Sequence, residues 1–337
     1  MKAMVVRSPR SPLVPEEREV PKPGRGQVRI KVRACGVCHS DQLVTDGLWP
    51  GLELPRVPGH EVAGVVDALG EGAQRFQVGD RVGLGWHGGH DGTCDRCLTG
   101  RFINCRNARI TAISFDGGYQ EFVIAPEVAV APIPKGLDFA EAAPLMCAGV
   151  TTFNALRNSP ARYGDLVAIQ GLGGLGHLGV QYARAMGFEV VGISRGTDKE
   201  EFARKLGAHH YVDSNRKDFA EAMAKLGGAK VILATAPHAR SISALVQGLG
   251  VEGCLLIVAA AFEPLEINAI DLISRVARVQ GWASGTAADS ADAMAFAVKH
   301  DVRAMIERFP LSDASRGLEA MLKGTVRFRA VLDVAPH

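Results

Sequence analysis

The residues of this sequence best suited to chemistry are two cysteines and a histidine, Cys38, Cys147 and His60. Zinc binds thiolate sulfur and imidazole nitrogen, and three protein ligands leave its fourth tetrahedral position open to water or substrate. Zinc held in this way polarises an oxygen atom. The three residues therefore predict a catalytic zinc site, although a single buried cysteine or histidine is more often structural.

A glycine-rich turn is the second sign of chemistry. Residues 167–170 read as a buried strand, and residues 178–186 read as a helix. The turn between them follows the pattern G-x-G-x-x-G and contains Gly171, Gly173, Gly174, Leu175 and Gly176. This context is typical of a dinucleotide site, because backbone approaches the pyrophosphate and the helix N-terminus favours its negative charge. Combined with a Lewis-acid metal, it predicts hydride transfer to or from an alcohol carbon.

The end of the next predicted strand indicates which dinucleotide binds. An acidic residue at this position would bind the ribose hydroxyls of NAD, but the strand ends in Ser194 and Arg195, with Lys199 close behind. A hydroxyl followed by two cations favours a ribose 2′-phosphate, so the sequence predicts NADP. NAD stays the alternative, since a bent loop would bring Asp198 to the ribose.

The composition bounds the class of protein. The chain has 337 residues, a net charge of +2 and interleaved charges, which predicts about two domains and no nucleic-acid partner. The N-terminal residues turn polar at once, and the longest apolar run, residues 254–262, is shorter than the roughly 20 residues that span a bilayer. We therefore expect a soluble, cytoplasmic protein without a membrane partner. The seven cysteines then indicate metal binding or catalysis and not disulfides.

Two folding patterns follow one another along the chain. Residues 1 to about 140 read as short strands separated by glycine and proline, which indicates a barrel-like all-β domain. From about Gly164, apolar strands alternate with helices, which predicts a doubly wound parallel sheet and an α/β fold. We expect domains at residues 1–148 and 149–285, and a segment at residues 286–337 that returns to the first domain.

With these motifs in this order, the chain resembles the zinc-dependent alcohol dehydrogenases of the medium-chain dehydrogenase/reductase superfamily over nearly its whole length. The resemblance is greatest to the bacterial and yeast tetrameric branch. It implies a GroES-like β-barrel catalytic domain, a Rossmann domain and an enzyme that interconverts primary alcohols and aldehydes. It also implies a homo-oligomer, a tetramer or else a dimer, whose other partner is a small-molecule substrate.

The resemblance assigns roles to residues beside the first zinc. Glu61 lies beneath the zinc and binds it transiently, and Asp41 orients His60, although a helix-capping role for Asp41 is the alternative. Ser40 bonds the substrate oxygen and starts a proton relay, while His39 contacts the cofactor pyrophosphate.

A second zinc is implied by a motif that normally carries four cysteines. Here its members are Asp91, Cys94, Cys97 and Cys105. A carboxylate also binds zinc, so we expect two zincs per chain, with a metal-free loop as the alternative. The nearby His87 and His90 do not match the motif's spacing.

Two tryptophans, Trp49 and Trp86, fall where the resemblance implies a substrate pocket. Such a pocket would be narrow and apolar, as suits primary alcohols and aldehydes, whereas the alternative for both rings is ordinary core packing. Two other functions stay open: an aryl or cinnamyl-type aldehyde reductase that uses NADPH, and a nucleotide-binding relative without catalysis.

Overall fold

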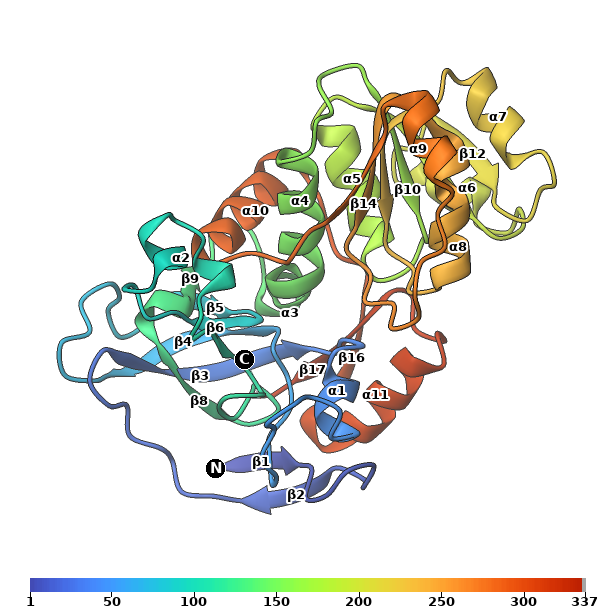
Figure 1. Cartoon of the computed structure of the whole chain (residues 1–337). Helices are drawn as coiled ribbons and strands as arrows, with labels where there is room; N and C mark the ends of the chain where they lie inside the picture. Colours follow the sequence, from blue (N-terminus) through green and yellow to red (C-terminus); the bar gives the residue numbers. More distant parts are fainter. Residues whose placement is uncertain (335–337) are drawn as a thin grey trace. The chain divides into compact units, whose positions relative to one another are not determined.

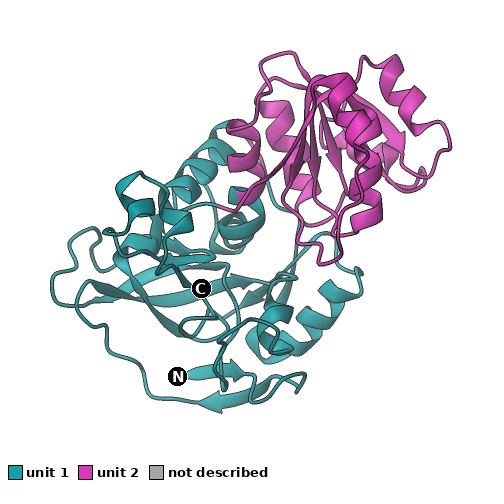
Figure 2. Ribbon diagram, in the orientation of Figure 1, with its two compact units in different colours: residues 1–150, 285–299, 303–337 teal, residues 151–284, 300–302 magenta. Residues whose placement is uncertain are grey.

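The computed structural model describes residues 1–334, which form two compact units (Figure 2). Unit 1 comprises residues 1–150, 285–299 and 303–334. Unit 2 comprises residues 151–284 and 300–302. Each unit is built on its own β-sheet.

A mostly antiparallel sheet forms the centre of unit 1 (Figure 1). Its strands lie in the order β16 (Ile306–Pro310), β17 (Arg329–Asp333), β3 (Gln27–Gly36), β4 (Val62–Leu69), β5 (Arg81–Leu84) and β9 (Val130–Pro132), and β8 (Phe122–Pro126) also pairs with β3. Val28, Ile30 and Val32 alternate with less buried residues along β3, as expected for a strand with one face in a core. Because β17 pairs with β3, the C-terminal part of the chain completes the sheet of the N-terminal part.

Short elements complete unit 1. Small ribbons pair β1 (Lys2–Val5) with β2 (Val14–Glu17) and β6 (His87–Gly89) with β7 (Arg109–Ile110). The α-helices are α1 (Asp41–Thr45), α2 (Asp95–Leu98), α3 (Phe139–Pro144), α10 (Ala287–His300) and α11 (Ala314–Leu322). Shorter helical turns are η1 (Phe102–Asn104), η2 (Glu127–Ala129), η3 (Leu145–Gly149) and η5 (Leu311–Asp313).

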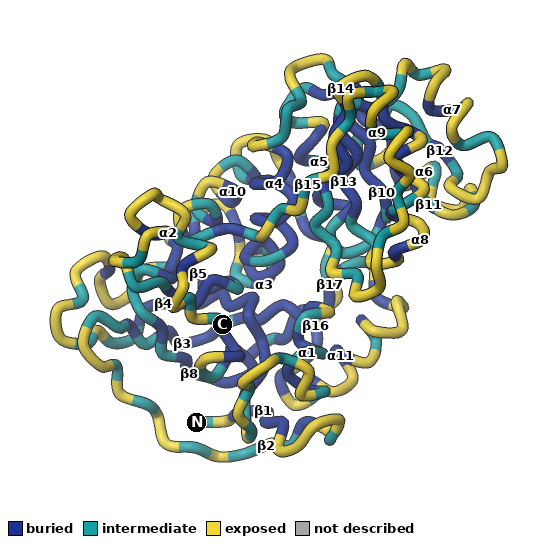
Figure 3. Tube along the Cα trace, viewed as in Figure 1, coloured by how far each residue is buried: buried dark blue, intermediate teal, exposed yellow. Residues whose placement is uncertain are grey.

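Unit 2 is built on a parallel sheet. Its strands lie in the order β12 (His210–Asp213), β11 (Glu189–Ser194), β10 (Leu166–Gln170), β13 (Ala229–Ala234), β14 (Leu249–Ile257) and β15 (Arg278–Gly281). Every residue of β10 is buried, as expected for a central parallel strand covered on both faces (Figure 3). The strand order reverses beside β10, which is the doubly wound arrangement that binds dinucleotides at the carboxyl ends of its strands.

Helix α4 leads into this sheet, and the other helices of unit 2 connect its strands. They are α4 (Val150–Arg157), α5 (Gly176–Ala185), α6 (Glu200–Lys205), α7 (Phe219–Lys225), α8 (Ala239–Ala244), η4 (Leu245–Gly248) and α9 (Ala269–Arg275). Nowhere in residues 1–334 does a helix have the length and apolarity needed to cross a membrane.

Candidate metal centres and cofactor site

The structure brings together the residues predicted to bind the catalytic metal. We call Cys38, His60, Glu61 and Cys147 the first metal cluster, and their candidate ligand atoms all lie within 4.8 Å of one another. Sγ of Cys38 lies 3.9 Å from Sγ of Cys147. The first cysteine follows β3, whereas Cys147 lies in η3, a π-helical turn of a kind frequent at functional sites.

His60 is oriented as a metal ligand. Its Nδ1 lies 3.0 Å from Oδ1 of Asp41, and an ionised carboxylate only accepts hydrogen bonds, so Nδ1 donates. The other ring nitrogen, Nε2, is buried without a hydrogen-bond partner among the described residues, and it offers a lone pair when the ring is neutral. An unsatisfied buried nitrogen destabilises a fold by about 1–3 kcal/mol, and a metal ion would satisfy it. The donor set of the first metal cluster therefore fits zinc.

Asp41 accepts hydrogen bonds from three groups. Besides His60, the backbone N–H of Cys38 and the hydroxyl of Tyr119 each donate to Oδ2 of Asp41 over 2.9 Å. Burial raises the pKa of the Tyr119 phenol, so the hydroxyl keeps its proton and acts as a donor. Nothing in the sequence points to Tyr119, because a buried tyrosine needs some partner but a separation of 78 residues from Asp41 does not say which.

Glu61 forms a buried ion pair with Arg329. The guanidinium Nη2 bonds Oε1 of Glu61, and both side chains are almost fully buried. Burial raises the pKa of the Glu61 carboxyl, and the Arg329 charge limits that rise. The other carboxylate oxygen, Oε2, has no hydrogen-bond partner among the described residues. Arg329 comes from β17, 268 residues along the chain, and no local motif indicates it.

The two sulfurs of the first metal cluster affect each other's pKa. The hydrogen bond that they share lowers the pKa of Cys38, against the opposing effect of burial. The same bond raises the pKa of Cys147. Both sulfurs bind a metal ion as thiolates.

The predicted pocket tryptophans lie beside the first metal cluster. The Trp86 ring meets the His60 ring edge-on at a centroid distance of 5.0 Å, and Trp49 lies 5.5 Å from Trp86. Both indoles are partly buried and pack against the core of unit 1. Next to Cys38, His39 is exposed, and Ser40 makes no capping hydrogen bond at the start of α1.

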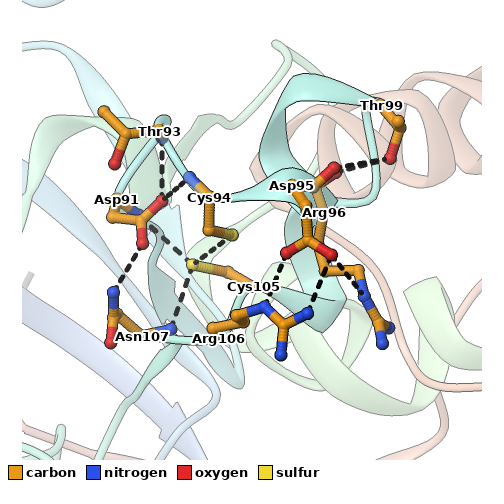
Figure 4. A network of polar contacts seen from close by, with 9 residues as sticks. All are labelled: Asp91, Thr93, Cys94, Asp95, Arg96, Thr99, Cys105, Arg106 and Asn107. Carbon is orange, nitrogen blue, oxygen red and sulfur yellow. Dashed lines mark hydrogen bonds and ion pairs between the residues drawn. The ribbon is translucent and has the colours of Figure 1, made fainter.

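The residues of the second motif also converge. Candidate ligand atoms of Asp91, Cys94, Cys97 and Cys105, the second metal cluster, all lie within 4.8 Å of one another. Figure 4 shows three of them, with Sγ of Cys94 lying 3.8 Å from Sγ of Cys105. His87 and His90 stack on each other at 5.2 Å and do not join the cluster.

The Asp91 carboxylate accepts three hydrogen bonds that fix its orientation. Its Oδ1 accepts from the backbone N–H groups of Thr93 and Cys94, and its Oδ2 accepts from Nδ2 of Asn107 at 2.7 Å (Figure 4). These bonds, the Cys94 N–H first, hold the pKa of Asp91 well below its usual range. The backbone N–H of Asn107 also donates to Sγ of Cys105 at 3.3 Å. Asn107, which the sequence analysis missed, thus supports two members of the second metal cluster.

The glycine-rich turn connects β10 to α5 in unit 2. A Cβ atom on Gly176 would lie 1.7 Å from the carbonyl oxygen of Gly171, so only glycine allows this close packing of helix on strand. Ser194 ends β11, Arg195 and Asp198 are exposed, and the ammonium of Lys199 donates to the carbonyl of Leu172 at 3.2 Å. Lys199 therefore lies against the glycine-rich turn.

Known proteins match both halves of the chain. Residues 24–135 match the model of the alcohol dehydrogenase GroES-like domain, and residues 174–299 match that of the zinc-binding dehydrogenases. Alcohol dehydrogenase patD of Penicillium expansum is 49% identical over 94% of this chain and 93% of its own length. An alcohol dehydrogenase of Geobacillus stearothermophilus is 39% identical over 99% of this chain and all of its own. The solved structure of a cinnamyl alcohol dehydrogenase from Sorghum bicolor is 32% identical with a TM-score of 0.91, covering 98% of this chain and 97% of that one.

The chain belongs to the zinc-dependent alcohol dehydrogenases of the medium-chain dehydrogenase/reductase superfamily. This confirms the predicted family and the predicted α/β fold, a GroES-like domain with a Rossmann domain. It also confirms the general activity, because the members of this family are alcohol and aldehyde oxidoreductases.

Replacing Cys38 tests the first metal cluster of this alcohol dehydrogenase. We expect Cys38→Ser to lower the zinc content by one ion per chain and to reduce turnover at least about 10³-fold, because a hydroxyl is a poor zinc ligand. Binding of the nicotinamide cofactor should change less than about twofold, since the glycine-rich turn lies in unit 2. Elemental analysis, steady-state kinetics and cofactor titration measure these effects. Cys254→Ser, at a buried cysteine outside both clusters, is the control, and a folded Cys38→Ser protein with full activity would contradict the assignment.

The second metal cluster generates another prediction. We expect Asp91→Ala to remove one zinc per chain and to lower Tm by about 5 °C, because a closed four-ligand site contributes folding free energy. Asp95→Ala is the matched control, since Asp95 lies between Cys94 and Cys97 in the sequence but bonds Arg106. Elemental analysis and thermal unfolding are the measurements. One zinc per chain in fully loaded wild-type protein would count against a metal at Asp91.

Proposed function

We propose that this protein is a zinc-dependent oxidoreductase that interconverts primary alcohols and aldehydes with NADP as hydride carrier. The observation that carries the proposal is the first metal cluster, where two sulfurs and an otherwise unpartnered imidazole nitrogen converge. Cys38, His60 and Cys147 would hold the zinc, with Glu61 as the fourth member of the cluster. Zinc bound there supplies a Lewis acid for the substrate oxygen.

The residues around the cluster supply the remaining functions. Asp41 fixes the imidazole of His60, and the indole of Trp86 covers the same ring. The Ser40 hydroxyl is not used to cap α1, so it can exchange a proton with the substrate oxygen. His39, exposed beside it, would bond the cofactor pyrophosphate.

The cofactor preference rests on the end of β11. Ser194 ends β11, the cations Arg195 and Lys199 follow it, and the Lys199 ammonium donates to the carbonyl of Leu172 in the glycine-rich turn, which supports a site for a ribose 2′-phosphate here. A phosphate accepts from a hydroxyl and from cations, whereas a ribose hydroxyl pair prefers a carboxylate. The exposed Asp198 is the carboxylate of the following loop that would serve NAD instead.

A cofactor comparison with a panel of aldehydes tests the proposal. We expect NADPH to exceed NADH at least about tenfold in kcat/KM, and we expect Ser194→Asp to reverse that preference by repelling the 2′-phosphate. Asp198→Asn is the matched variant, which should leave NADH use unchanged. A wild type that prefers NADH tenfold would contradict the proposal, and an Asp198→Asn variant that loses NADH use would show that Asp198 binds the ribose.

The substrate class follows from the tryptophans beside His60. Trp49 and Trp86 meet edge to face, which suits a narrow apolar pocket for unbranched primary alcohols and aldehydes. The likeness to a cinnamyl alcohol dehydrogenase favours aryl aldehydes as the second candidate.

Removing one indole separates the two substrate classes. We expect Trp49→Ala, which leaves Trp86 on His60, to raise kcat/KM for cinnamaldehyde relative to butanal by about tenfold, since the pocket widens. Kinetics with both aldehydes measure the ratio, with Tyr163→Ala, at an exposed tyrosine of unit 2, as control. A wild type that already prefers cinnamaldehyde would assign the enzyme to the aryl class.

We infer that copies of this chain associate through unit 2. Strand β15 is a sheet edge whose residues are mostly exposed, and an edge presents unpaired backbone groups to another strand. The neighbouring α9 exposes Ile270 and Ile273, and Val276 after it is 72% exposed. A second copy offers the same edge and the same apolar surface, so a two-fold contact would bury both.

A charge on this surface tests the association. We expect Ile273→Asp to dissociate the oligomer into a smaller assembly, because burying an unpaired carboxylate is costly. Light scattering would then give a lower molar mass than for the wild type. Val78→Asp, at an exposed valine of unit 1, is the control. Light scattering that gives a monomer for the wild type would contradict the association.

A further inference from the structure

The Tyr119 hydroxyl is placed to act on the first metal cluster from outside it. Tyr119 is 0% exposed and donates to Oδ2 of Asp41 at 2.9 Å. Asp41 is also 0% exposed, so water does not compete for its oxygens. The phenol therefore supplies one of the hydrogen bonds on which this buried carboxylate depends.

The three donors are divided between the two carboxylate oxygens of Asp41, and this arrangement fixes the orientation of the carboxylate. Oδ2 receives the Tyr119 hydroxyl and the Cys38 backbone N–H, and Oδ1 receives Nδ1 of His60. If the phenol were removed, the carboxylate would have one hydrogen bond fewer to keep it from rotating away from the imidazole. A single carboxylate thus connects Tyr119 to two predicted zinc ligands.

The backbone holds the tyrosine ring against the turn that carries His60. The N–H of Tyr119 donates to the carbonyl of Pro58 at 3.0 Å, and that of Gly118 donates to the carbonyl of Gly59 at 2.7 Å. Gly59 has φ +99°, and a Cβ atom there would lie 2.4 Å from Cδ1 of Tyr119. The ring is therefore held by packing and backbone bonds that do not involve its hydroxyl.

We propose that Tyr119 is a positioning residue, whose hydroxyl acts through Asp41 to hold His60 in the orientation that retains the catalytic zinc. The inference rests on the proposed zinc site. Groups that bond a metal ligand typically change metal affinity or activity by 10–100-fold. Tyr119 acts one hydrogen bond further out, so its removal should fall near the lower end, at about tenfold.

Tyr119→Phe removes the hydroxyl and keeps the ring. We expect a chelating dye to remove the catalytic zinc about tenfold faster than from the wild type, at an unchanged rate for the second zinc. The catalytic release phase is the one that Cys38→Ser lacks. Tyr182→Phe, at a fully buried tyrosine of unit 2, is the matched control and should leave both phases unchanged.

Two further measurements separate positioning from general destabilisation. For Tyr119→Phe we expect kcat to fall while KM for NADPH stays within about twofold. In a protein that already carries Asp41→Asn, we expect Tyr119→Phe to have no further effect on kcat or on the rate of zinc release. Zinc release that matches the wild type, or accelerates equally for both zincs together with a lower Tm, would overturn the inference. A wild type whose zinc content equals that of Cys38→Ser would instead show that the proposed zinc site is wrong.

Discussion

The buried carboxylate of Asp41 is the constraint on which the first metal cluster depends. A carboxylate without solvent contact is tolerated only when its oxygens are well satisfied, and three donors converge on this one. Two of these donors belong to predicted zinc ligands, Cys38 and His60. The interaction that stabilises the buried charge therefore also fixes the spacing of the ligands, and the site is organised by the protein itself.

The fold brings these groups together from distant parts of the chain. Cys38 leaves the end of β3, His60 precedes β4, and Cys147 lies in the π-helical turn η3. Strand β17, near the end of the chain, pairs with β3 and delivers Arg329 to Glu61. Breaking such a buried pair by removing one partner typically costs about 3–5 kcal/mol. The pairing of β17 with β3 therefore also supplies the positive charge that Glu61 requires in the site.

How far the sequence predicts the site depends on how local each signal is. The predicted ligands of both metal clusters and the glycine-rich turn stand in short motifs, and the structure places each set together. The alternating strands and helices after residue 164 likewise predicted the parallel sheet of unit 2. Tyr119, Arg329 and Asn107 carry no such signal, because their roles arise from tertiary contacts. A buried arginine or tyrosine must have a partner, yet only the folded chain shows which partner it has.

The central claim is that Cys38, His60 and Cys147 bind the catalytic zinc. X-ray absorption at the zinc edge of the Asp91→Ala protein tests it most directly, because that variant should contain only the catalytic ion. The account predicts two sulfur ligands at about 2.3 Å and an imidazole nitrogen at about 2.0–2.1 Å, with a light atom completing the shell. A shell of three or four sulfurs, or of nitrogen and oxygen alone, would contradict it.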